Sequence, residues 1–197
     1  MILKFDKKYW EANYTNGTTG WNIGEISTPI KEYINQLSDK NSSILIPGAG
    51  NAYEAEYLYT KGFNNVFILD IAHNPLQNFK YRNPSFPDSH LLEEDFFEHN
   101  KTYDLIIEQT FFCALHPSQR TNYAKRMHSL LTKGGKLVGL LFNFPLTNEG
   151  PPFGGSYEEY QKIFEPYFDL LTLEKCHNSI KPRANREFFI ILKKKQL

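Results

Sequence analysis

Three residues in the first half of the chain have the types and spacing of a nucleoside-binding site. Gly48 and Gly50 follow the apolar run SILIP (43–47), and Asp70 ends the run VFILD (66–70). Glycine lets a backbone turn sharply and approach a ligand closely, and the N–H groups of a helix after such a turn suit a carboxylate or phosphate. An acid roughly twenty residues further on accepts hydrogen bonds from ribose hydroxyls. The spacing therefore indicates a ligand that contains a nucleoside.

Other residues narrow the class of this ligand. Asp95 and Phe96 follow a third, weaker apolar run, and this pair is suited to flank an adenine ring. A dinucleotide site requires a third glycine, and Tyr53 stands where that glycine would fall. The lysine of a P-loop does not follow the glycine turn, which excludes that class. The pattern fits an adenosine with a carboxylate and no pyrophosphate, and a nicotinamide oxidoreductase is a remoter interpretation.

Both tryptophans of the chain lie in one polar stretch near its start, YWEANYTNGTTGW (9–21). Trp10, Tyr14 and Trp21 supply flat aromatic surface in a segment without a core-facing periodicity. Two interpretations are open: the segment packs on the domain as an N-terminal arm for stability, or it closes over a ligand.

The elements that must position these residues alternate along the chain. Helical patterns separate the first five strands, which predicts parallel crossovers, helices on both faces of the sheet and ligands at the carboxyl ends of the strands. The last two strands have no helix between them, which predicts an antiparallel hairpin at one edge of an α/β fold. The apolar runs place the strands at 43–47, 66–70, 90–95, 103–108, 136–143, about 168–175 and 187–193.

Turn and cap residues predict where two of the helices begin and end. Thr28 is a capping residue, and Pro29 falls in the first turn of the helix that follows it. Pro117 opens a later helix, whose apolar stripe continues to Leu131 and which Gly134–Gly135 closes.

Composition sets the broad class. The chain has 197 residues, 41% of them hydrophobic, which favours one domain over 1–197, with an arm at 1–27 and a core at 28–197. A formal net charge of zero gives no global attraction for nucleic acid or an anionic membrane, and no apolar run approaches the roughly 20 residues that cross a bilayer. Two cysteines without a C-x-x-C motif favour a reducing, cytoplasmic setting. The six scattered histidines predict no metal site.

Several motifs along the chain are shared with one known family. They are the arm pattern W-x-x-x-Y-x-x-G-x-T-x-W, PGAGNAYE (47–54), FILDI (67–71), EEDFF (93–97), YDLIIEQTFFCALHPSQR (103–120), GPPF (150–153) and a late basic loop. Nearly end to end, the chain resembles a class I S-adenosylmethionine-dependent methyltransferase of the thiopurine S-methyltransferase and plant-type halide/thiol methyltransferase family. The resemblance implies a Rossmann-like, seven-stranded, mostly parallel sheet in the order 3-2-1-4-5-7-6, with strand seven antiparallel.

The resemblance also implies S-adenosyl-L-methionine as cofactor and S-adenosyl-L-homocysteine as product. In that arrangement the glycines lie under the methionine part, Asp70 holds the ribose, Glu108 helps to orient the adenine amino group, and the arm closes as a lid. Aromatic faces attract a cation such as a sulfonium by roughly 0.5–2 kcal/mol, and they keep water away from its methyl group. Carried over residue by residue, the cofactor contacts fall on Trp10, Tyr14, Trp21, Gly48, Gly50, Asp70, Ile71, Asp95, Phe96 and Glu108.

The acceptor pocket is expected beside this site. Phenylalanine walls favour small, polarizable acceptors such as thiols, thiopurine-like compounds, halides or sulfide. Gln109 stands where the thiopurine enzymes have an arginine, so a preference for thiopurines is not indicated. The residues expected to line the pocket are Gln109, Phe111, Phe112, Pro151, Pro152, Phe153, Arg183 and Arg186.

The mechanism depends on the protonation of the acceptor. A thiolate or halide needs no general base, whereas an alcohol or an ammonium group does. The sequence EQTF after the fourth strand, in place of the N/D-P-P-Y motif of many amino-group methyltransferases, favours the first case. His116 is the candidate base, with a structural role as its alternative. Two other functions remain as alternatives: an O- or N-methyltransferase of another small metabolite, and a non-catalytic cofactor-binding protein. We expect a monomer, with a homodimer as the alternative. The expected partner is a small-molecule acceptor.

Overall fold

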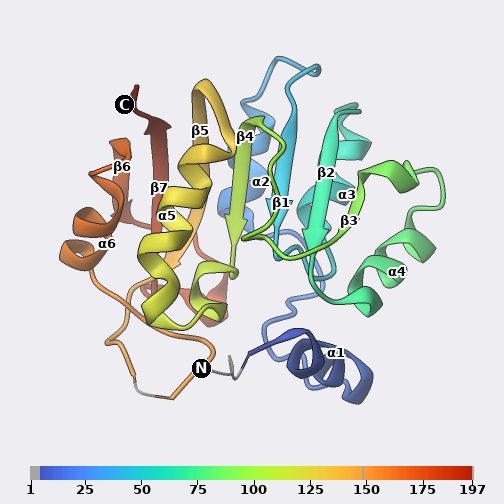
Figure 1. Ribbon diagram of the computed structural model, residues 1–197, viewed down its shortest axis with the longest axis horizontal. Coiled ribbons are helices and arrows are strands. Elements are labelled where there is room, and N and C mark those ends of the chain that lie inside the picture. Colours follow the sequence, from blue (N-terminus) through green and yellow to red (C-terminus); the bar gives the residue numbers. More distant parts are fainter. Residues whose placement is uncertain (1–4, 148, 197) are drawn as a thin grey trace.

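A seven-stranded sheet forms the centre of the protein, in the strand order β3-β2-β1-β4-β5-β7-β6 (Figure 1). The computed structural model describes residues 5–147 and 149–196. Strands β1 to β5 run parallel to one another, and β7 runs antiparallel to both β5 and β6. This confirms the predicted strand order and the closing hairpin. The strands cover Ile44–Pro47 (β1), Val66–Asp70 (β2), Leu91–Glu93 (β3), Tyr103–Gln109 (β4), Leu131–Phe142 (β5), Phe168–Lys175 (β6) and Glu187–Lys194 (β7).

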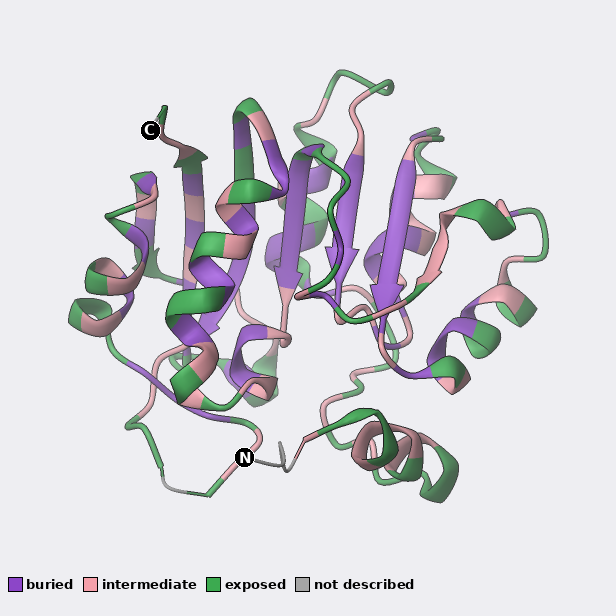
Figure 2. Ribbon diagram, in the orientation of Figure 1, coloured by how far each residue is buried: buried purple, intermediate pink, exposed green. Residues whose placement is uncertain are grey.

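Helices cover both faces of the sheet, as the alternation of elements predicts. One apolar core lies between the sheet and helices α2, α3 and α4, and a second core lies between the opposite face and helices α5 and α6. Every residue of β1 and β2 is buried (Figure 2), because a parallel sheet with helices on both sides has no face left for solvent. The helices cover Lys7–Asn16 (α1), Thr28–Asn35 (α2), Tyr53–Thr60 (α3), His73–Arg82 (α4), Arg120–Ser129 (α5) and Tyr157–Phe164 (α6).

The junction between α5 and β5 differs from its prediction. Helix α5 ends at Ser129, and β5 begins at Leu131 instead of 136. Leu131 pairs with Tyr103 of β4, and the N–H of Tyr103 donates to the carbonyl of Leu130 at 2.8 Å. The predicted apolar stripe is therefore shared between a helix and a strand, because pairing with β4 outweighs the local helical pattern. Gly134, at φ +80°, lies inside the strand and does not close the helix.

Two smaller boundaries also differ. Strand β3 ends at Glu93, so Asp95 lies in the loop after the strand. Thr28 is the first residue of α2 and not its cap; Ser27 occupies the cap position. The Ser27 hydroxyl does not cap the helix; it points to Gln109 and donates to its Oε1 at 2.8 Å.

The N-terminal arm contains a helix, which its lack of apolar periodicity did not predict. Asp6 caps α1 by accepting a hydrogen bond from the N–H of Tyr9 at 3.0 Å, and Gly17 ends the helix at φ +70°. No residue of α1 is buried. Figure 1 shows α1 on the side of the sheet toward which β1, β2 and β4 point. Residues 1–4 of the predicted arm lie outside the described residues.

Short 3-10 helices occupy four of the loops around this side of the sheet and its edges. They cover Asp88–His90 (η1), Phe112–Ala114 (η2), Pro117–Gln119 (η3) and Lys181–Arg183 (η4). Among the helices of the described residues, none has the length and apolarity to cross a membrane.

Candidate active site

A cavity of about 770 Å³ lies at the carboxyl ends of the central strands, beneath the arm. Its size is within the range of small-molecule and cofactor sites. The floor is formed by the loops after β1, β2 and β4, and the roof by α1 and the residues that follow it. Ligands of open α/β sheets bind at this edge, so the topology and the cavity agree on the location of the site.

The turn after β1 forms the part of the floor that lies closest to the surrounding aromatic side chains. Gly48 and Gly50 have φ values of +56° and +52°, which side chains rarely adopt. A Cβ added to Gly48 would lie 2.2 Å from the ring of Phe111, and one added to Gly50 would lie 2.7 Å from Tyr14 Oη. The two glycines therefore allow the backbone to turn beneath aromatic side chains from two other segments.

Asp70 lies at the end of β2 and lines the cavity. Its Oδ2 accepts a hydrogen bond from the N–H of Gly50 at 2.9 Å, and its Oδ1 accepts one from the N–H of Ala72 at 2.8 Å. Burial raises the pKa of this carboxyl to about 6, and the two N–H donors oppose that rise only in part. The carboxylate is thus fixed in orientation between the glycine turn and the start of α4, with lone pairs left for further donors.

Three aromatic rings of the arm form a connected group above the floor. Trp21 lies edge-on to both Trp10 and Tyr14, with ring centroids 5.4 and 5.8 Å apart. All three rings line the cavity. Burial, followed by the charge of Asp70, raises the pKa of the Tyr14 hydroxyl well above its ordinary value, so this hydroxyl stays neutral. The group offers a cation a roof of ring surface without a formal charge.

The wall on the β3 side carries the predicted adenine contacts. Ile71, Asp95 and Phe96 all line the cavity. The exposed Asp95 accepts a hydrogen bond from the N–H of Phe97 at 2.8 Å, and the buried ring of Phe96 packs edge-on against Phe111 at 5.1 Å.

The opposite wall contains two buried donors without acceptors. Gln109 accepts from the Ser27 hydroxyl through Oε1, and its Nε2 has no hydrogen-bond partner among the described residues. Arg183 donates from Nη2 to the carbonyl of Trp21 at 2.9 Å, while its buried Nη1 makes no hydrogen bond there and lies 3.6 Å from Glu187 Oε1. Both side chains line the cavity. A ligand group that carries an acceptor oxygen or nitrogen atom, or a negative charge, would satisfy these donors.

Other predicted acceptor residues lie near this wall. Phe111, Pro151 and Pro152 line the cavity, as does the exposed Arg186. The Arg186 guanidinium lies over the ring of Phe144 at 4.8 Å, which places a second cation at the rim.

The structure does not bring Glu108 to the cavity surface, contrary to its predicted contact with the cofactor. Its Oε1 accepts from the N–H groups of Phe111 and Phe112, at 2.8 and 2.9 Å, and its Oε2 accepts from the Tyr123 hydroxyl. The side chain is fully buried, and burial raises its pKa to about 7. Glu108 therefore holds the loop after β4 and has no free oxygen facing a ligand.

Three further predicted residues also lie outside the lining. Phe112 is buried against Tyr123 of the core, because the turn at η2 directs it away from the cavity. Phe153 is buried beside the ring of His116, at 5.9 Å. His116 itself is exposed, and its Nδ1 lies 2.8 Å from the Ser118 hydroxyl at the start of η3. A helix-start contact of this kind is the structural alternative considered for this histidine.

Two residues that the sequence did not assign to the ligand line the cavity. Glu54, in the first turn of α3, is buried, and burial raises its pKa to about 7 although Arg183 opposes the rise. Its place four residues after Gly50, on a helix that starts at the floor, was the available signal. Cys113 lines the cavity from η2, and burial raises the pKa of its thiol well above its ordinary value, so it remains protonated.

No cluster of metal ligands accompanies the cavity. Within residues 5–147 and 149–196, there is no group of three or more histidine, cysteine, aspartate or glutamate side chains arranged to hold a metal ion.

Comparisons with known proteins identify the family. The model of the family described as thiopurine S-methyltransferase matches residues 5–190. "Probable thiol methyltransferase 2" of Arabidopsis thaliana is 31% identical over 184 residues, which cover 90% of this chain and 81% of the relative. Thiocyanate methyltransferase 1 of Brassica oleracea is 27% identical with the same coverage.

A solved structure supports the fold independently. The crystal structure of Burkholderia thailandensis 1,6-didemethyltoxoflavin-N1-methyltransferase, with bound 1,6-didemethyltoxoflavin and S-adenosylhomocysteine, superimposes with a TM-score of 0.77 at 15% identity. The match covers 96% of this chain and 87% of that chain. From the family match, the identity to its relatives and the shared sheet order, the chain belongs to the thiopurine S-methyltransferase family of S-adenosylmethionine-dependent methyltransferases.

Proposed function

We propose that this methyltransferase transfers the methyl group of S-adenosylmethionine to a small, soft nucleophile, with a thiol as the leading class and halide, sulfide or thiocyanate as related acceptors. The observation that carries the proposal is the pair of unsatisfied donors, Gln109 Nε2 and Arg183 Nη1, in a cavity roofed by aromatic rings. The names of the thiol and thiocyanate methyltransferases among its relatives support the same class.

The residues around the cavity fit the cofactor. Asp70 presents carboxylate lone pairs where a ribose would donate, and the turn at Gly48 and Gly50 leaves room for a chain beside the backbone. Trp10, Tyr14 and Trp21 would face the sulfonium end. The cofactor supplies an electrophilic methyl group on a positively charged sulfur.

The protein's contribution is alignment and the exclusion of water. The arm covers part of the cavity and its rings line it, which limits the access of water, a competing nucleophile, to the methyl group. Holding donor and acceptor in line replaces a bimolecular encounter, and well-oriented pairs reach effective molarities of roughly 10⁵ M or more. This alignment needs no residue that changes its protonation state.

The acceptor would enter beside Phe111, Pro151 and Pro152. Gln109 and Arg183 would then hold its negative charge or acceptor atoms. Arg183 is buried against the ring of Phe142 at 5.7 Å, and its Nη1 lies 3.6 Å from Oε1 of the buried Glu187, so the acceptor would share this guanidinium with Glu187. An anion held in this way arrives at the sulfonium already deprotonated, so the reaction does not require the candidate base His116.

One observation favours a second candidate, methyl transfer to a hydroxyl or amine. Glu54 lines the cavity, and its pKa of about 7 suits a general base near neutral pH. This candidate predicts that Glu54→Gln abolishes turnover of the physiological acceptor. The first candidate predicts that turnover of a preformed thiolate survives this change.

The test is a panel of acceptors with labelled S-adenosylmethionine. We expect methyl transfer to thiols, sulfide, thiocyanate or iodide, and a rate that follows the thiolate fraction across thiols of different pKa. Transfer to a hydroxyl or amine alone would replace the first candidate by the second. Binding of the cofactor without transfer to any member of a broad panel would instead support a non-catalytic binding protein.

We also propose a monomer in a reducing, cytoplasmic setting, in which residues 1–197 form one domain with 28–197 as its core and 1–27 as its lid. Cys113 and Cys176 are both free and buried, which agrees with a reducing compartment. Sedimentation of the purified protein at the mass of one chain is the expected result, and a dimer mass would contradict it.

A further inference from the structure

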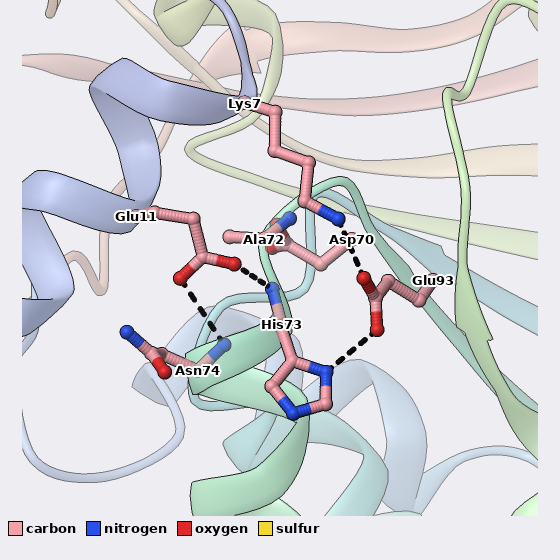
Figure 3. Close-up of polar contacts among 7 residues, drawn as sticks. All are labelled: Lys7, Glu11, Asp70, Ala72, His73, Asn74 and Glu93. Atoms are coloured by element: carbon pink, nitrogen blue, oxygen red, sulfur yellow. Dashed lines mark hydrogen bonds and ion pairs between the residues drawn. The ribbon is translucent and has the colours of Figure 1, made fainter.

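Helix α4 begins without a cap of its own. Its cap position is Ala72, whose side chain cannot accept a hydrogen bond. The first N–H groups of a helix have no partner within the helix, and a polar cap residue normally satisfies one of them. In this protein the carboxylate of Glu11, on the arm, takes that place: it accepts hydrogen bonds from the N–H of His73 and, at 3.4 Å, from the N–H of Asn74 (Figure 3).

The capped turn is the one that carries the predicted ribose contact. Asp70 accepts from the N–H of Ala72, and Glu11 accepts from the next two N–H groups along the chain. Ile71, between Asp70 and Ala72, lines the cavity. Three successive backbone donors are thus held by two carboxylates, one from β2 and one from the arm. The arm therefore helps directly to hold the turn that follows Asp70.

Further polar contacts join the arm to the same region. Lys7 Nζ lies 2.5 Å from Glu93 Oε1, and His73 Nδ1 lies 2.7 Å from Glu93 Oε2 (Figure 3). Asn74 Nδ2 donates to the Thr15 hydroxyl at 3.0 Å. These side chains are largely exposed, and exposed ion pairs contribute little individually. Glu11 differs from them because it satisfies backbone donors at a helix terminus, where negative charge is favoured.

Helix α1 has no buried residue, yet it roofs the cavity. Opening of the arm gives a cofactor a path into the cavity and the product a path out of it. When the arm is displaced, α4 loses its cap. The hydrogen bonds of Glu11 exist only in the closed state, so their free energy stabilises the closed complex.

We propose that Glu11 is a positioning residue, which caps α4 from the arm and so couples closure of the arm to the geometry of the Asp70 turn that binds the cofactor. This role concerns the cofactor alone and is independent of the acceptor that the enzyme uses.

The test measures binding of S-adenosylhomocysteine to the full chain by calorimetry. Loss of a cap corresponds to about a fivefold change in an equilibrium, and to roughly thirtyfold at most. We expect Glu11→Ala to weaken binding by about fivefold or more and Glu11→Gln, which keeps the volume and one acceptor oxygen, to weaken it less. Glu174→Ala, which removes an exposed carboxylate from the distant strand β6, is the matched control and should bind as the unmodified protein does.

A second readout separates a cap from any other contact of the arm. Ala72→Ser gives α4 a cap of its own, because a serine hydroxyl at the cap position accepts from an N–H of the first turn. In this background the loss caused by Glu11→Ala should shrink to less than twofold. The two tryptophans of the chain both line the cavity, so their emission at saturating S-adenosylhomocysteine reports closure, and it should reach the same end point in every variant.

Affinity that stays within twofold in both Glu11 variants would overturn the proposal. A lower urea midpoint with unchanged affinity would also overturn it, because it would show a purely structural cap. An equal loss with and without the Ala72→Ser substitution would show that Glu11 acts other than as a cap, and the assignment would again fail. Should Glu11→Ala not fold, Glu11→Gln decides by the same criteria.

Discussion

Replacing Asp70 by asparagine perturbs one atom of the side chain that we expect to hold the cofactor ribose. The carboxylate accepts hydrogen bonds from the N–H groups of Gly50 and Ala72 and has lone pairs left for the ribose hydroxyls. An asparagine retains one acceptor oxygen, and its amide nitrogen then faces one of those backbone donors. The change therefore removes the charge and at least one charge-assisted hydrogen bond, while the volume of the side chain is preserved.

The magnitude follows from the burial of this group. Asp70 is 7% exposed, so water cannot replace a lost partner. A hydrogen bond to a charged group contributes about 1.5–3 kcal/mol, which corresponds to a change in affinity of roughly 10- to 150-fold. We therefore expect Asp70→Asn to weaken S-adenosylhomocysteine binding by about 10- to 150-fold. Asp169→Asn, at an exposed position of β6, should have no effect.

Calorimetric titration at several pH values completes this test. Burial raises the pKa of Asp70 to about 6 from its ordinary 3.8, so protonation below about pH 6 stabilises the ligand-free fold. The ribose hydroxyls need the ionised form as acceptor, so the affinity of the unmodified protein should fall as pH decreases through about 6. That fall should be absent in Asp70→Asn. Equal affinity of the two proteins at a pH well above that pKa, or the same pH profile in both, would refute the assignment.

Five further substitutions test other parts of the site. His116→Ala should leave turnover of a thiol within about twofold, because the side chain is exposed outside the cavity, and a loss above tenfold would restore it as a base. Arg183→Met should raise KM for an anionic acceptor by about tenfold or more, whereas Arg186→Met at the exposed rim should raise it less. Trp10→Leu should weaken the binding of S-adenosylmethionine more than that of S-adenosylhomocysteine. The difference in binding free energy should reach up to about 2 kcal/mol, because only S-adenosylmethionine carries a sulfonium cation. Glu108→Ala should lower the free energy of unfolding in urea by about 1–3 kcal/mol, because it leaves the N–H groups of Phe111 and Phe112 and the Tyr123 hydroxyl without their acceptor. Burial raises the pKa of Glu108 to about 7, so the stability that its protonated form contributes is lost as pH rises through about 7, and the variant should lack that part of the pH dependence.

The sequence predicts the centre of the sheet well because β1 and β2 are short, fully buried and bounded by clear turns. The runs that became β1 and β2 are almost wholly apolar, and both keep their predicted ends at Pro47 and Asp70. The start of β5 was predicted wrongly, because Leu131 continues a helical stripe in sequence and is drawn into the sheet only by Tyr103, a residue distant in the chain.

For the site, the sequence predicts which residues reach the cavity when they directly follow strands, and predicts this less well for residues whose direction is set by tertiary packing. Gly50 and Asp70 lie at the ends of parallel strands, so their place at one edge follows from topology. Glu108 also lies at the end of a strand, but the loop after β4 turns back and takes both of its oxygens. Glu11 gave no signal, because its partners are backbone N–H groups of a helix roughly sixty residues away, which only the folded chain brings to it.

A crystal structure of the complex with S-adenosylhomocysteine would decide whether the cavity beneath the arm is the cofactor site. We expect the ribose within hydrogen-bonding distance of the Asp70 carboxylate, the sulfur beneath the rings of Trp10 and Trp21, and Glu11 still bound to the start of α4. A complex in which the ligand occupies another surface, or in which the arm lies away from a filled cavity, would show that the site and its lid have been assigned wrongly.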